Sequence, residues 1–190
     1  MIIDEDIVAG GVTPFIITKL IERHERERQR YRLLHDYYMG DHRILSRRKR
    51  GKNVANNRIM CNHAKYITDM TQSYLVGNPV TYAVSDEYDI EAIKNEYLEQ
   101  DMPSVDSEIV KNMSIYGKAY ELIYADEKSQ PRSVRLDPEH TFVCYSQSAF
   151  EKPLFAVYYY KKYDLDGYCT GSICRVYDES FIYTYTAVSY

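Results

Sequence analysis

The 190-residue sequence predicts an α+β fold, in which a helix-rich N-terminal half precedes an antiparallel, tyrosine-rich β-sheet. Up to Gly117 the apolar residues recur with the 3.6-residue period of helices, and after Gly117 they alternate with the period of two of strands. The chain contains 21 tyrosines, 5 phenylalanines and no tryptophan, and aromatic side chains favour strands. A chain of 190 residues is long enough to bury a substantial core, and this length leads us to expect a single domain over residues 1–190.

The first helix is predicted to begin at Pro14, because Thr13 is a suitable N-cap and proline is favoured at the first helical position. We expect residues 1–13 before it to be flexible. Residues 22–30 contain no apolar side chain, so this part of the helix is predicted to face solvent or another chain. Gly40 is the predicted end of the helix.

Three further helices follow the 3.6-residue period before Gly117, so that residues 14–117 are predicted to be mainly helical. The second helix begins after a cap at Asn56 or Asn57 and ends at Gly77. A short strand and two more helices follow it. They are expected at residues 80–84, 88–100 and 103–116.

Residues 118–190 are predicted to be mainly β, because aromatic and β-branched residues alternate with polar ones. The pair Asp166-Gly167 predicts a hairpin turn. Consecutive side chains of a strand point to opposite faces, so at most two of Tyr158, Tyr159 and Tyr160 share a surface. We therefore interpret the tyrosines as packing or subunit-interface residues in preference to a base-stacking surface. The expected strands are 118–125, 133–136, 141–145, 154–161, 173–177 and 181–190.

The formal net charge of −4 conceals an uneven distribution. The stretch from Lys19 to Arg58 contains 13 basic and 5 acidic residues, and the remainder of the chain is acidic. A basic stretch on an acidic body predicts one surface that faces phosphate groups, although basic helix faces are also often simply solvated. We name residues 43–58 the basic segment. Its candidate phosphate contacts are Arg43, Arg47, Arg48, Lys49, Arg50, Lys52 and Arg58.

The sequence lacks the motifs of the common enzyme classes. Gly10-Gly11 has neither the lysine nor the spacing of a phosphate-binding loop, and His24-Glu25 is not followed by the second histidine of a zinc-protease motif. The four cysteines form no C-x-x-C pair. We therefore predict no catalysis, no metal and no cofactor. Neither a signal peptide nor an apolar run of about 18 residues is present, so no membrane association is expected.

Short motifs follow one another in a distinctive order between Tyr31 and Tyr82. They include Tyr-Tyr-x-Gly-x-His, Asn-Asn-Arg-Ile and Tyr-Leu-x-Gly-Asn-Pro. This order resembles the start of portal proteins, the head–tail connectors of long-tailed bacteriophages typified by a Bacillus phage portal. The resemblance covers about residues 20–185, with one departure at Asn78, where the family usually has lysine or arginine. The matching positions are Tyr38, Gly40, His42, Asn56, Asn57, Arg58, Asn62, Tyr74, Gly77, Pro79 and Gly117.

The resemblance implies a structural role. Proteins of this family form a ring, usually of twelve subunits, at one capsid vertex, and double-stranded DNA is packaged and ejected through it. The chain resembles the wing portion alone, without stem, clip and crown, and we expect the natural polypeptide to continue beyond Tyr190. Implied partners are further copies of the chain, capsid and scaffold proteins, and DNA without sequence preference. Terminase and head-completion proteins would bind the missing parts.

The same resemblance implies assembly in the host bacterial cytoplasm and a final location in the virion. The alternative from another class is a soluble nucleic-acid-binding module, in which the basic segment grips phosphate and tyrosines stack on bases. That alternative requires tight, salt-sensitive DNA binding by the monomer. An enzyme of unfamiliar type would require a cleft with converging titratable groups.

Overall fold

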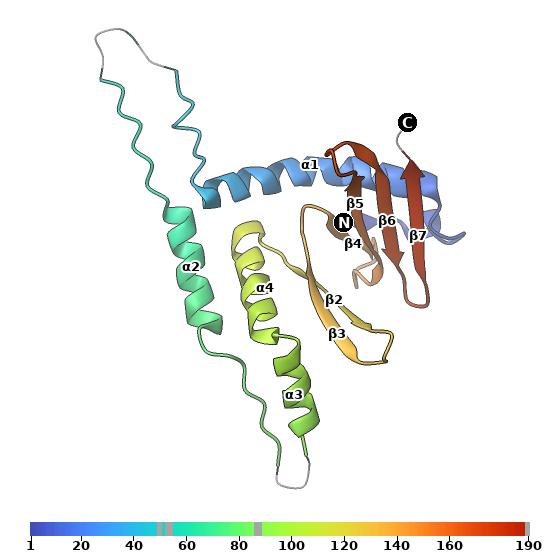
Figure 1. Ribbon diagram of the computed structural model, residues 1–190. Helices are drawn as coiled ribbons and strands as arrows, with labels where there is room; N and C mark the ends of the chain where they lie inside the picture. Colours follow the sequence, from blue (N-terminus) through green and yellow to red (C-terminus); the bar gives the residue numbers. More distant parts are fainter. Residues whose placement is uncertain (49–50, 52–54, 86–88, 189–190) are drawn as a thin grey trace. The chain divides into compact units, whose positions relative to one another are not determined.

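The computed structural model describes residues 1–48, 51, 55–85 and 89–188, and Figure 1 shows the arrangement of its helices and strands. By packing, the chain divides into two compact units. Unit 1 comprises Met1–Gln29 and Leu136–Tyr190, and unit 2 comprises Arg30–Arg135. Within the described residues, four α-helices of the N-terminal half precede the main strands. The predicted α+β class is therefore confirmed.

Unit 1 is built on a five-stranded sheet with the order β1-β4-β5-β6-β7 (Figure 1). The four longer strands pair antiparallel, as predicted. The short strand β1 (Ile2–Ile3) pairs in parallel with β4, which makes the sheet mixed. The other strands are β4 (Thr141–Ser146), β5 (Pro153–Tyr163), β6 (Cys169–Tyr177) and β7 (Ile182–Val188).

The first residues of the chain lie against β4. The Met1 ammonium group donates to the Val143 carbonyl oxygen at 2.6 Å, and Ile3 is only 8% exposed. A 3₁₀ helix, η1 (Glu5–Ile7), comes next. We expected residues 1–13 to be flexible. In the structure, Ile2 and Ile3 pair with the edge of β4 that would otherwise be open.

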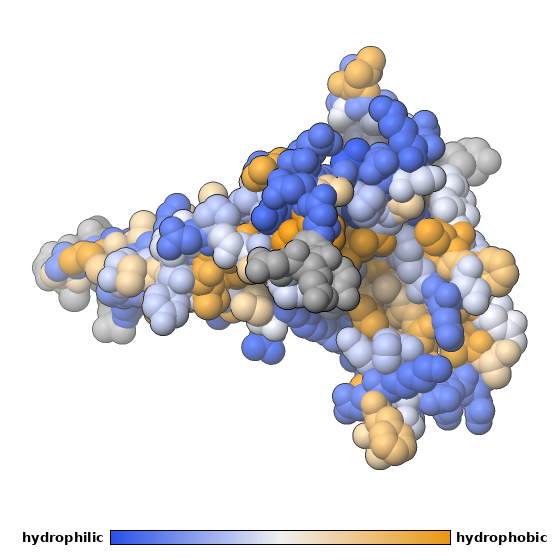
Figure 2. All heavy atoms as spheres, turned by 90° about the horizontal axis from the view of Figure 1, so that it is seen from below, coloured by the Kyte–Doolittle hydropathy of each residue, from blue (hydrophilic) through white to orange (hydrophobic). Residues whose placement is uncertain are grey.

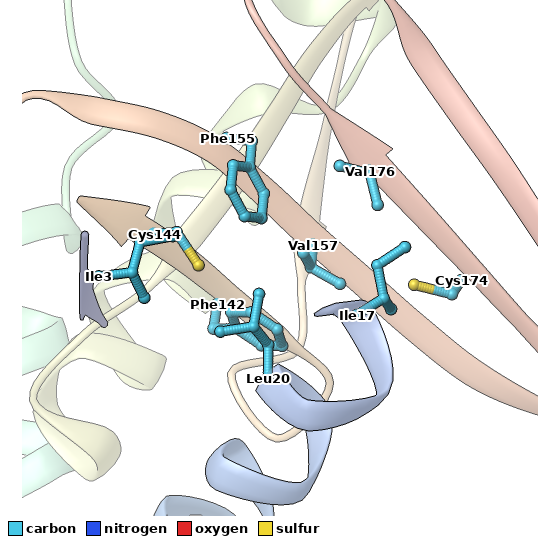
Figure 3. Packing of buried hydrophobic residues seen from close by; sticks show 9 residues of the cluster. All are labelled: Ile3, Ile17, Leu20, Phe142, Cys144, Phe155, Val157, Cys174 and Val176. Atoms are coloured by element: carbon cyan, nitrogen blue, oxygen red, sulfur yellow. The ribbon is translucent and has the colours of Figure 1, made fainter. Parts of the chain in front are cut away.

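Helix α1 (Pro14–Met39) begins and ends where the sequence predicted, and Gly40 follows it with a φ of +91°. Its part up to Gln29 belongs to unit 1, where Ile17 and Leu20 point toward the apolar side chains of the sheet (Figure 3). Together, these two helix residues and the apolar residues of the sheet form the core of unit 1. Each residue of this core is at most 9% exposed. The cluster consists of Ile3, Ile17, Leu20, Phe142, Cys144, Phe155, Val157, Cys174 and Val176.

The polar stretch 22–30 is not exposed on all sides, so the prediction for it was wrong. His24 is 1% exposed, and its Nδ1 lies 2.9 Å from the Tyr159 hydroxyl. The Arg28 side chain is 17% exposed, and its Nε lies 3.9 Å from a Glu139 carboxylate oxygen. A helical stretch without aliphatic residues can therefore still pack against unit 1, with the Tyr159 hydroxyl beside His24 and the Glu139 carboxylate near Arg28.

Unit 2 contains the end of α1, three further helices and a two-stranded sheet. Helix α2 lies alongside α4 (Figure 1). Helix α4 ends at Gly117, as predicted, with a φ of +75° that suits glycine. The elements are α2 (His63–Val76), α3 (Glu91–Glu99), α4 (Met102–Tyr116), β2 (Tyr120–Ala125) and β3 (Pro131–Leu136).

Two predictions for unit 2 were wrong. Helix α2 begins well after the expected caps at Asn56 and Asn57, because Asn62 is its N-cap and accepts from the Lys65 backbone N–H at 3.0 Å. The strand expected at 80–84 is not formed, since these residues have no strand partner in the described part of the chain. A β-prone sequence without an available sheet edge remains irregular.

Candidate functional site

Several of the motif positions lie where α1 meets α2 and α4. Tyr38 is 9% exposed, and its hydroxyl donates to Asp69 Oδ1 at 3.4 Å. The ammonium groups of Lys65 and Lys111 lie 5.5 and 5.9 Å from the centroid of its ring, within cation–π range. Tyr38 therefore joins three helices and has a structural role.

The neighbouring motif positions shape the turn after α1. A Cβ added at Gly40 would lie 3.3 Å from Asn62 Nδ2 and from Met60 Cε, and the positive φ adds strain. The His42 ring stacks on Tyr37 at 4.8 Å between centroids, and its Nε2 lies 3.1 Å from the Tyr37 carbonyl oxygen. The turn therefore has room only for glycine at position 40, and the aromatic ring of His42 packs on Tyr37.

Asn62 serves both helices at this junction. Its side-chain oxygen caps α2, and its Nδ2 donates to the Tyr38 carbonyl oxygen at 2.8 Å. The remaining motif positions are dispersed. Gly77 and Gly117 cap α2 and α4, Asn56 is half-buried, and Asn57, Arg58, Tyr74 and Pro79 are exposed. The structure therefore brings Tyr38, Gly40, His42 and Asn62 together and leaves the others apart.

The described arginines of the basic segment are exposed to solvent. Arg43, Arg47, Arg48 and Arg58 are all exposed, whereas Lys49, Arg50 and Lys52 lie outside the described residues. The Arg58 guanidinium group donates to the Leu45 carbonyl oxygen at 2.9 Å, which links the two sides of the segment. Exposed guanidinium groups are suited to phosphate oxygens, which accept two hydrogen bonds from one arginine.

Helix α2 packs on α4 through polar side chains. Thr68 is 4% exposed, and its hydroxyl accepts from the Ser114 hydroxyl at 3.3 Å. The Gln72 amide donates to the Ser107 hydroxyl at 2.7 Å. The buried side of α2 is therefore polar.

The side of α2 turned away from α4 carries large apolar residues that are between 55% and 88% exposed. We name this surface the α2 apolar face; it consists of Tyr66, Ile67, Met70 and Tyr74. Figure 2 shows that hydrophobic residues lie open to solvent elsewhere on the molecule too. The 3.6-residue period of the sequence identifies such a stripe but does not reveal that the stripe is uncovered, so sequence reasoning missed this surface.

A groove of about 380 Å³ lies between α3 and the start of β3. Its walls are held by Gln100, whose amide donates to the Pro131 carbonyl oxygen at 2.7 Å and whose oxygen accepts from the Ser133 N–H at 2.9 Å. The apolar side chains that line it, the α3–β3 groove, are Ala92, Ile93, Met102 and Pro131, together with the ring of Tyr97.

Ion pairs and a half-buried phenol connect the elements of this region. Arg132 bridges Glu96 at 2.7 Å and Asp126 at 3.0 Å. The Tyr97 hydroxyl donates to Asp106 at 2.7 Å. Burial, followed by that hydrogen bond, raises the pKa of Tyr97 to about 12.

In the described ranges, no three histidine, cysteine, aspartate or glutamate side chains converge as metal ligands. No helix in that part of the chain is both long and apolar enough to span a membrane.

Comparison with known proteins identifies the class of protein to which these surfaces belong. The family model described as "Phage portal protein, SPP1 Gp6-like" matches residues 17–190, so the chain belongs to this family of phage portal proteins. One relative is the portal protein of Bacillus phage SPP1, which is 29% identical over 185 residues. The match covers 91% of this chain and 36% of the relative. The resemblance predicted from the motifs is confirmed, and the chain spans little more than a third of that relative's length.

Proposed function

We propose that the chain is the N-terminal, wing-like part of a portal subunit that assembles with further copies into a ring at one vertex of a phage capsid. The observation that carries this proposal is the colinear family match over residues 17–190. The exposed α2 apolar face supports it, because contiguous apolar side chains on a protein surface mark interaction sites. In this role the chain is structural and performs no catalysis.

The ring would be the conduit for packaging and ejection of double-stranded DNA and a platform for head assembly, with about twelve subunits. Capsid and scaffold proteins are the proposed partners of this part of the subunit. Terminase and head-completion proteins would contact parts of a portal subunit outside the portion of the relative that this chain matches. The resulting location is the virion, after assembly in the host bacterial cytoplasm.

The basic segment is the proposed DNA contact. Support comes from the exposed guanidinium groups of Arg43, Arg47 and Arg48. Contacts to phosphate position a protein on DNA without reading its sequence. We therefore expect weak, sequence-independent binding of duplex DNA by the chain alone.

Light scattering and a duplex titration on two polypeptides test the proposal. The 190-residue chain should be monomeric or form small, concentration-dependent oligomers, whereas the polypeptide of the complete gene should form particles of ring mass. A complete polypeptide that stays monomeric under all conditions would refute the portal role. Nanomolar, sequence-selective DNA binding by the 190-residue chain would instead favour the nucleic-acid-binding module.

A further inference from the structure

Helix α2 turns its polar side to the protein and its apolar side to solvent, which is the reverse of an ordinary surface helix. Such helices turn an apolar stripe to the core and polar residues to water. Here Thr68 and Gln72 face α4, while Tyr66, Met70 and Tyr74 are 64%, 55% and 88% exposed. These three residues succeed one another at intervals of four and form one projecting ridge. A ridge of this kind is unfavourable in water unless a partner covers it.

The same unit carries a second apolar surface of a different shape. The α3–β3 groove is concave, and Ile93 on its α3 side is 60% exposed. The hydrogen bonds of Gln100 to Pro131 and Ser133 connect the end of α3 to β3 beside the groove. One chain therefore offers both a ridge and a groove.

We propose that the α2 apolar face of one subunit docks into the α3–β3 groove of a neighbouring copy of the same chain. The inference rests on the proposed function, because a ring of more than two subunits needs a head-to-tail contact between two different surfaces of each chain. An isologous pair would need only one surface, and it would leave either the ridge or the groove uncovered.

The charges beside the two surfaces are complementary. The described part of the basic segment, which precedes α2 in the chain, carries four exposed arginines, Arg43, Arg47, Arg48 and Arg58. Residues 89–108, which include α3 and border the groove, contain seven acidic residues and one basic residue, Lys94. Docking of the ridge into the groove of another copy brings opposite charges together, which favours this partner and orients it.

The available area sets the strength of the contact. A buried aromatic side chain covers about 150–250 Å², so the partly exposed residues of the ridge and the groove together would bury about 800–1,000 Å². This is below the roughly 1,200–2,000 Å² of a stable, specific interface. The docking is thus weak in the 190-residue chain and becomes stable when many copies close a ring.

Cross-linking between two variants tests the docking directly. The exposed Cys61 and Cys169 are first replaced by serine. A Tyr74→Cys chain is then mixed with an Ile93→Cys chain and treated with a short bismaleimide. The control mixture pairs Ile93→Cys with Tyr168→Cys, since Tyr168 is 73% exposed but lies in unit 1. We expect a several-fold excess of mixed dimer over the control, and equal yields would overturn the proposal.

A second pair of variants separates docking from folding. Because Tyr74 and Tyr168 are both exposed, neither Tyr74→Ser nor Tyr168→Ser should change the melting temperature appreciably. Self-association measured by sedimentation should weaken about tenfold or more for Tyr74→Ser alone, as expected of an aromatic anchor. Equal association of both variants would overturn the proposal, as would a Tyr74→Cys/Ile93→Cys double variant that cross-links only within one chain.

The complete polypeptide distinguishes failure of the docking from failure of the portal role. Rings that assemble normally with Tyr74→Ser would overturn the docking and leave the portal role intact. If the unmodified complete polypeptide forms no rings, the portal role fails, and the cross-linking result still decides whether copies dock through α2.

Discussion

Replacement of Phe155 by alanine should strongly destabilise unit 1. Phe155 lies in β5, is 4% exposed and belongs to the apolar cluster between α1 and the sheet (Figure 3). Removal of a buried phenyl ring loses its transfer free energy and leaves a cavity, which together cost about 3–5 kcal/mol. A domain is stable by only about 5–15 kcal/mol in total. The substitution therefore removes a large fraction of the free energy of unfolding.

Phe150 offers the matched control, because it is 93% exposed and lies only a few residues earlier. Phe150→Ala should change the free energy of unfolding by no more than about 0.5 kcal/mol. Urea unfolding monitored by circular dichroism measures both variants. With a slope of about 1–3 kcal/mol per molar urea, the midpoint of Phe155→Ala should fall by at least about 1 M. Similar midpoints for the two variants would refute the assignment of Phe155 to the core.

Three further predictions concern reactivity, pH and salt. Burial raises the pKa of both Cys144 and Cys174 to about 11. Ellman's reagent at pH 8 should therefore modify these two thiols only after unfolding. Prompt reaction of all four thiols of the folded protein would contradict the burial of Cys144 and Cys174. The pKa of Tyr97 is raised from 10.0 to about 12, so its contribution to stability is present below pH 10 and is lost as the pH rises through 12. Tyr97→Phe should flatten the alkaline fall of the urea midpoint, and an unchanged slope would contradict this reasoning. If the basic segment binds about five to seven phosphates, log affinity for duplex DNA should fall with log salt with a slope of about −4.5 to −6.3. Substitution of both Arg47 and Arg48 by alanine should reduce the magnitude of that slope by about 1.8, and an unchanged slope would show that these residues do not contact DNA.

The predictable parts of the fold are those that local residues determine. Pro14 and Gly40 delimit α1, and Gly117 ends α4, because the preferred backbone angles of proline and glycine act without any distant partner. The start of α2 was missed, since Asn62 is held there by the Tyr38 carbonyl oxygen from another part of the chain. Strand β1 was missed for the same reason: only the edge of β4 makes two residues a strand.

The candidate site was partly predictable. The order of the motifs identified the portal family, and several of those positions prove to be caps, turns and helix junctions. Which side of α2 is covered could not be read from a 3.6-residue period, because the period is the same for a covered and an uncovered stripe. The burial of His24 was missed because its partner, Tyr159, lies far away in the sequence.

Electron microscopy of the polypeptide of the complete gene tests the central claim most directly. If the chain is part of a portal subunit, we expect closed rings with a central channel. Their class averages should share one rotational symmetry, with about twelve subunits in each ring. Monomers, open filaments or particles without rotational symmetry, under conditions in which the polypeptide is folded, would contradict the assignment of this chain to a portal ring.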